Sequence, residues 1–258
     1  MNKITCIESR IDKEQNHYAC FLIEALEIGQ GITLGNSLRR TLLSDLTSFA
    51  ITGARINNLK HEFSIIPCVR EDVLEILLNL KEIIFKESFL KKETLIRRKS
   101  KAFLHVKGPV IVTAGMFRLP PDCFKILNPA QYICTLLDDS EFYLEVDIEN
   151  GKGYRTIEEV NKLKANEIFH PYIPTTFFID TIFMPVKKVN YKVKLIHDTR
   201  GNIKESLTLE ILTNGSTTPK RSLQDSLKIL LSLFYSVAAT PTFLKVASEF
   251  SKEFFKEE

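Results

Sequence analysis

The stretch Gly29-Gln-Gly-Ile-Thr-Leu-Gly-Asn-Ser-Leu-Arg-Arg-Thr-Leu-Leu-Ser44 decides the fold, because it separates a strand-like pattern from a helix-like one. Residues 17–28 place apolar side chains on both faces of a predicted strand. Residues 29–35 predict a loop, and residues 36–49 predict a helix that Asn36 or Ser37 can cap. One arc of this helix is apolar and should be buried. The arc consists of Leu34, Leu38, Leu42, Leu43, Leu46 and Phe49.

The three glycines of this stretch raise the question of a dinucleotide-binding site. Their spacing, Gly29-x-Gly31-x-x-x-Gly35, is one residue longer than the fingerprint of such sites. No acidic residue ends a following strand about 20 residues further on, where a ribose would need one. We therefore interpret the glycines as a turn through which the chain enters the helix.

The remaining pattern mixes helices and strands, so an α+β fold is expected. Residues 69–81 predict a helix, and residues 141–149 alternate as a half-buried strand does. Residues 191–197 and 206–213 predict a hairpin. Thr218-Pro219 opens a long helix that is apolar on more than one face, so it should be covered on two sides. Its apolar residues include Leu223, Leu227, Leu230, Leu231 and Phe234.

Composition excludes several classes of protein. The chain has 258 residues, 44% of them hydrophobic and 26% charged, with a net charge of +3, which excludes a disordered chain. The longest apolar stretch, residues 229–244, is shorter than the ~20 residues of a membrane span and is broken by Pro241. The amino terminus lacks the apolar core of a signal peptide and the arginines of a transit peptide, so no membrane and no import are expected.

No group of residues has the spacing of a catalytic or metal site. The five cysteines contain no CxxC pair, and the five histidines are scattered. Asp138-Asp139 lacks the clustered carboxylates of two-metal nucleotidyl transfer. We therefore expect no catalytic residue, metal or cofactor in this chain, and five reduced thiols.

Positive charge is concentrated in residues 86–107, which hold eight Lys and Arg residues against two Glu residues. Three interpretations remain open: a sheet edge guarded by lysines, a surface for an acidic protein, and a surface for nucleic acid. The candidate residues of this patch are Lys91, Lys92, Arg97, Arg98, Lys99 and Lys101.

Several segments resemble the α subunit of bacterial-type DNA-directed RNA polymerase, and they occur in the same order. They are residues 31–44, 61–64, 69–81, 108–114, 150–154, 184–186 and 213–220. Details such as Leu119-Pro-Pro121 and Ile182-Phe-Met-Pro-Val186 resemble the plastid-encoded branch. The expected location is the chloroplast stroma, with the gene in the organelle, and the alternative is the bacterial cytoplasm.

The resemblance implies the α amino-terminal fold, in which both chain ends build a dimerisation domain around an inserted, mostly β domain. We expect residues 1–49 and 182–258 in the first domain and residues 50–181 in the second. The dimer would recruit the catalytic β and β′ subunits, β′ being split in plastids, to transcribe DNA into RNA from ribonucleoside triphosphates. The apolar arc of the first helix and the apolar residues of the last long helix would form the dimer interface.

The resemblance also assigns contact residues for the large subunits. Arg40 and Leu43 match positions that receive β. The residues implied for β′ are Glu75, Lys81, Ile179, Asp180, Phe183 and Val186. Catalytic magnesium would lie in β′. Because the sequence stops at Glu258, no carboxy-terminal DNA-binding domain is expected, and DNA would be met only through the complex. The alternative is a free-standing dimeric nucleic-acid-binding protein that uses the 86–107 patch.

Overall fold

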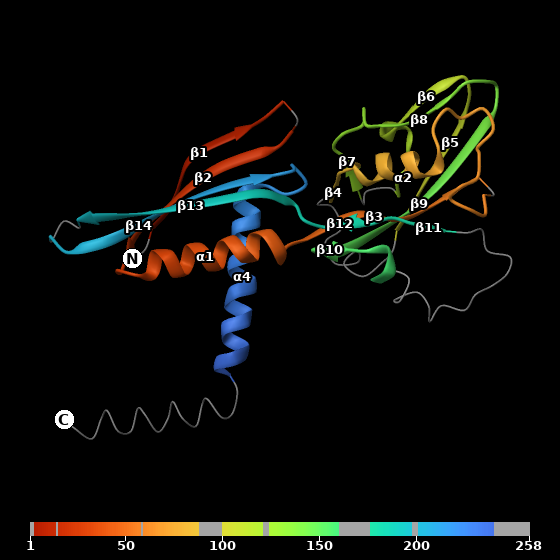
Figure 1. Cartoon of the computed structure of the whole chain (residues 1–258). Coiled ribbons are helices and arrows are strands. Elements are labelled where there is room, and N and C mark those ends of the chain that lie inside the picture. Colours follow the sequence, from red (N-terminus) through yellow and green to blue (C-terminus); the bar gives the residue numbers. More distant parts are fainter. Residues whose placement is uncertain are drawn as a thin grey trace.

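A computed structural model describes residues 3–13, 15–57, 59–87, 100–120, 124–159, 176–197 and 201–239. The described chain is mixed helix and sheet, with strands dominant. It forms two bodies with separate cores, seen at the left and right of Figure 1. We call them the terminal body, residues 3–46 and 186–239, and the inserted body, residues 47–182.

The terminal body contains a four-stranded antiparallel sheet in the order β1-β2-β14-β13. The strands are β1 (Lys3–Ile11), β2 (His17–Leu26), β14 (Ile203–Thr213) and β13 (Val186–His197). The predicted strand at 17–28 is confirmed as β2, which ends at Leu26. The predicted hairpin is confirmed as well, because β13 and β14 pair along their whole length. Segments from the two ends of the chain therefore lie side by side in one sheet.

Helix α1 (Gln30–Ser44) packs on one face of this sheet, against β13. A Cβ atom on Gly35 would lie 2.6 Å from the Tyr191 ring, and one on Gly31 would lie 2.9 Å from Val193. The two glycines are one helical turn apart, so together they allow the helix backbone to approach the strand closely. This close approach is the structural role of the glycine motif.

The amino terminus of α1 is bound by Glu205 of β14. Gly29 N–H and Gly31 N–H donate to the two oxygens of the Glu205 carboxylate, at 2.9 and 2.7 Å. Glu205 is 5% exposed. A carboxylate at this end of a helix accepts orphan backbone donors and interacts favourably with the helix dipole.

The predicted bounds of this helix were wrong at both ends. It begins at Gln30, because Gly29 adopts the left-handed conformation (φ 89°) and Glu205 supplies the acceptor that Asn36 or Ser37 was expected to provide. It ends at Ser44, because strand β3 (Thr47–Ile56) begins three residues later, where Thr47 pairs with Lys152 of another strand. Phe49 therefore lies in a strand and not on the helix.

Helix α4 (Pro219–Ala238) begins where the sequence predicts, with Thr218 as its cap. Its first half packs on the terminal body, where Leu223 is buried. Residues 231–239 are all exposed, and the helix extends away from the body (Figure 1). The expected final helix, near residue 256, lies outside the described residues.

The inserted body contains a second four-stranded sheet in the order β11-β3-β9-β5, with α2 (Val73–Lys81) against its core (Figure 1). The strands besides β3 are β11 (Phe177–Phe178), β9 (Glu141–Lys152) and β5 (Ser100–Lys107). Helix α2 starts four residues later than predicted, because Val69 bridges to Leu136 and Arg70 N–H donates to the Thr135 carbonyl. The predicted strand at 141–149 is confirmed and extends to Lys152.

Short elements complete the inserted body. Three two-stranded pairs form: β4 with β7, β6 with β8, and β10 with β12. Their bounds are Phe85–Glu87, Phe124–Ile126, Val110–Thr113, Tyr132–Leu136, Tyr154–Arg155 and Thr181–Ile182 in that order, and a 3-10 turn spans Ala114–Met116.

The described residues bear on two expectations, one about membrane-spanning helices and one about the cysteines. Among them, no helix combines the length and apolarity needed to cross a bilayer. The four described cysteines, Cys6, Cys20, Cys68 and Cys134, are free thiols, and burial raises the pKa of Cys134 to about 12. Cys6 is exposed whereas Cys134 is buried, so the four thiols differ in their accessibility to solvent.

We expect Gly35→Ala to destabilise the protein by about 1–3 kcal/mol, because the added methyl group overlaps the Tyr191 ring. The sign is informative, since Gly→Ala inside an unobstructed helix stabilises by ~0.5–1 kcal/mol. Urea unfolding measures the change. The double variant Gly35→Ala with Tyr191→Leu should recover stability, and a stabilising single variant would contradict the close packing.

Candidate functional site

The surface of α1 away from the sheet presents the residues assigned to β. Arg40 is exposed and makes no ion pair with any described residue. Leu43 is half-buried and packs against the core of the terminal body. Thr41, one residue on from Arg40, is 3% exposed, so the polar face available to a partner is narrower than the helix periodicity suggests.

A second surface joins two of the residues assigned to β′ through an aromatic side chain. The Lys81 ammonium lies over the Tyr154 ring, 5.7 Å from its centroid. The pKa of Tyr154 is raised by desolvation and by its hydrogen bond to Asp180. Ile182 pairs directly with Tyr154 across the β10–β12 ladder, and both are about half exposed. The result is one patch with a cation, an anion, a tyrosine and an isoleucine.

The position of α2, which carries Lys81, is held by buried polar contacts. Glu71 is 8% exposed and accepts hydrogen bonds from Tyr132 Oη and from Thr135 N–H. Asn79 donates from its amide to the Ile133 carbonyl at 3.0 Å. These bonds connect β8 to the segment just before α2 and to the last turn of the helix, so the Lys81 side chain projects from a rigid element.

Several residues predicted to contact β′ lie inside the protein. Ile179, Phe183 and Val186 are 4%, 0% and 3% exposed, so their side chains pack in the chain's own cores. Glu75 is exposed, but six residues before Lys81 it lies on a different side of α2. The sequence does not single out Tyr154, which lies beside Lys81 and Asp180, because the turn in which it occurs does not show whether its ring is exposed.

The residues predicted for the dimer interface also divide into buried and exposed ones. Leu38, Leu42, Leu46 and Leu223 are 0–6% exposed in the core of the terminal body, so the apolar arc of α1 is covered by the chain's own sheet. Leu34, Leu227 and Leu230 are partly buried against that core. Phe49 packs edge to face on Phe124 in the inserted body. Of the residues named for the interface, Leu231 and Phe234 are highly exposed, at 68% and 62%.

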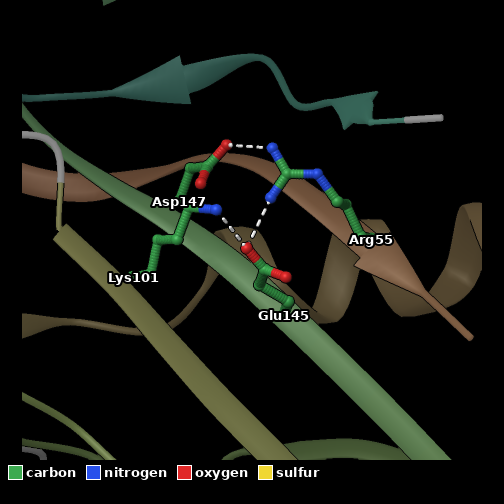
Figure 2. Close-up of polar contacts among 4 residues, drawn as sticks. All are labelled: Arg55, Lys101, Glu145 and Asp147. Carbon is green, nitrogen blue, oxygen red and sulfur yellow. Dashed lines mark hydrogen bonds and ion pairs between the residues drawn. The ribbon is translucent and has the colours of Figure 1, made fainter. Parts of the chain in front are cut away.

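Two described lysines of the basic segment, Lys101 and Lys107, are paired with carboxylates. Figure 2 shows Lys101 and Arg55 both directed at Glu145, at 2.6 and 2.7 Å, while Arg55 also reaches Asp147 at 3.2 Å. Lys107 pairs with Asp139 at 3.2 Å. Lys91, Lys92, Arg97, Arg98 and Lys99 lie outside the described residues.

Among the described ranges, no three His, Cys, Asp or Glu side chains gather in a way that could hold an ion. The patch of Lys81, Tyr154, Asp180 and Ile182 mixes apolar and charged side chains, a composition that protein interfaces share.

Comparison with known proteins identifies the family. Residues 54–184 match the family model described as RNA polymerase Rpb3/RpoA insert domain. The DNA-directed RNA polymerase subunit alpha of Porphyra purpurea is 45% identical over 235 residues, which is 91% of this chain and 70% of that protein. This chain belongs to the α-subunit family of DNA-directed RNA polymerase. The resemblance found in the sequence is confirmed.

Other α subunits match over nearly the same length. That of Guillardia theta is 42% identical over 232 residues, covering 90% of this chain and 68% of the relative. That of Trichormus variabilis is 41% identical over 232 residues, covering 90% and 69%. As an α subunit, the chain is an assembly subunit of a nucleotidyltransferase complex that carries out transcription, together with other polymerase subunits. A free-standing nucleic-acid-binding protein is not favoured.

We expect Arg55→Met to destabilise this α subunit by about 3 kcal/mol, because it leaves Asp147 and Glu145 without their shared, largely buried cation. Lys101→Met is the matched control, since the Lys101 side chain is 52% exposed and its ion pair is screened by water, so that it should cost less than about 1 kcal/mol. Chemical unfolding of both variants tests the difference. Equal losses would show that the Arg55 pair is not special.

Proposed function

We propose that this α subunit dimerises through the exposed end of α4 and that the dimer recruits the β and β′ subunits. The observation that carries the proposal is a group of large, highly exposed apolar side chains at the end of α4. They are Leu231, Leu233, Phe234 and Tyr235, each 55–76% exposed. An apolar surface of this kind on a helix that leaves the body is typical of an interface.

In this proposal the two bodies have different partners. The terminal body is the dimerisation domain of the α amino-terminal fold, and Arg40 with Leu43 on α1 contacts β. The inserted body contacts β′ through Lys81, Asp180 and the neighbouring Tyr154 and Ile182, because these lie together and are accessible. Catalytic magnesium lies in β′, and this chain reaches DNA through the complex.

The proposed compartment is the plastid, with a bacterial cytoplasm as the alternative. The relatives come from algae and from cyanobacteria at similar identity, which supports either origin.

We expect Leu231→Glu combined with Phe234→Glu to weaken the dimer at least about 100-fold, because burying each such side chain contributes ~1.5–3 kcal/mol. Sedimentation velocity across a concentration series measures the change. The folded monomer should keep its circular dichroism spectrum, since neither side chain belongs to a core.

The matched control is Ile4→Glu on β1, a side chain 50% exposed and distant in sequence from α4. It should leave the dimer unchanged. A double variant of α4 that dimerises like the wild type would refute the proposed interface.

Two further variants separate the large subunits. Arg40→Ala should lower retention of β in a pull-down, because a charged contact at a desolvated interface contributes ~1.5–3 kcal/mol. Lys81→Glu should keep the dimer and β but lower retention of β′. If the two variants lost the same subunit, or if neither lost any, the assignment of partners to the two bodies would be wrong.

A further inference from the structure

Strand β13 carries a row of lysines on the face of the sheet opposite α1. Helix α1 lies against Tyr191 and Val193, so the even-numbered positions of the strand point to the other face. Lys188, Lys192 and Lys194 share that outer face, and all are exposed. The strand contains no acidic residue, and Lys187 adds a fourth exposed cation.

These lysines differ from others on the described surface. Lys101, Lys107, Lys152 and Lys204 each pair with a carboxylate. Within the described ranges, Lys187, Lys188, Lys192 and Lys194 make no ion pair. They are therefore a local excess of positive charge and not one half of a neutral network.

The neighbouring strands supply little negative charge to offset the row. Glu210 of β14 faces Asn190 directly and accepts a long hydrogen bond from its amide, at 3.4 Å. Glu24 lies two strands away on β2. A groove of about 460 Å³ lies beside Lys188. Its lining has two cations, Lys188 and Arg10, and two anions, Asp12 and Glu210, so its charges balance. The excess thus lies on the strand itself, toward Lys192 and Lys194.

We propose that the outer face of β13 binds the phosphate backbone of a nucleic acid held by the polymerase, without reading its sequence. Neighbouring positions on one face of a strand are ~6.6 Å apart, so Lys192 and Lys194 are adjacent in the row, while Asn190 separates Lys188 from them by one position. The three charges therefore lie along one line. A linear polyanion fits such a row better than a compact acidic site does. Lysine acts as a point charge toward phosphate and gives no base specificity.

The membership of this chain in a polymerase supplies the ligand, because the complex holds DNA during transcription. The surface is separate from Lys101 and Lys107 of the inserted body and from the faces of α1, α2 and α4 to which the protein partners are assigned. The inference therefore goes beyond assembly and adds a direct contact between the α subunit and nucleic acid.

The test uses the whole polymerase assembled with the triple variant Lys188→Gln, Lys192→Gln and Lys194→Gln. Its affinity for a duplex DNA of arbitrary sequence is measured between about 50 and 200 mM salt. The negative slope of log affinity against log salt should become shallower by about 2–3, since each phosphate contact contributes ~0.9 to its magnitude. The corresponding triple Lys→Arg variant should keep the wild-type slope, because it keeps the charge.

The matched control replaces three dispersed, exposed lysines, Lys60, Lys125 and Lys220, with Gln, which gives the same net charge. Its slope should equal that of the wild type. An unchanged slope in the β13 variant would overturn the proposal, as would equal losses in both triples. If the β13 variant lost a polymerase subunit while its slope stayed unchanged, the proposal would also be overturned. That result would indicate that β13 binds an acidic protein partner. Co-purification of the large subunits with the wild type reports separately on the assembly surfaces.

Discussion

The close packing of α1 on β13 is the constraint on which the remaining structure depends. Gly31 and Gly35 add no side chain of their own to this contact, so the helix backbone packs directly on the side chains of Val193 and Tyr191, and Glu205 binds the first N–H groups of the helix. Because β14 also holds β2 and β13 in one sheet, this contact joins the two ends of the chain. It fixes which face of α1 is buried and which face presents Arg40.

The two surfaces proposed for partners, one on the terminal body and one on the inserted body, are built differently. In the terminal body, α4 begins in the core and ends in solvent, so its last turns are an apolar surface attached to a rigid base. In the inserted body, short ladders bring Tyr154 and Ile182 beside Lys81. A rigid support for each surface suits a subunit whose task is to position larger ones, because little ordering is then needed on binding.

The sequence predicts the regular elements better than it predicts their neighbours. The alternation in β9, β13 and β14 and the Thr218-Pro219 start of α4 are local signals, and each is confirmed. The start of α1 was missed because its capping group, Glu205, is 174 residues away from Gly31 in the chain. Periodicity shows that Leu38 and Leu42 are buried but not what covers them. An apolar run such as 179–186 fits an interface and a core equally well, and the structure shows that three of its residues are core.

We propose that this α subunit functions with the end of α4 covered by another chain. Hydroxyl-radical footprinting of the assembled polymerase tests it most directly, because oxidation reports the exposure of individual side chains. The account predicts that Leu231, Phe234 and Tyr235 are as unreactive in the complex as the fully buried Leu38. Oxidation of these three side chains at the rates expected from their 62–76% exposure would contradict it.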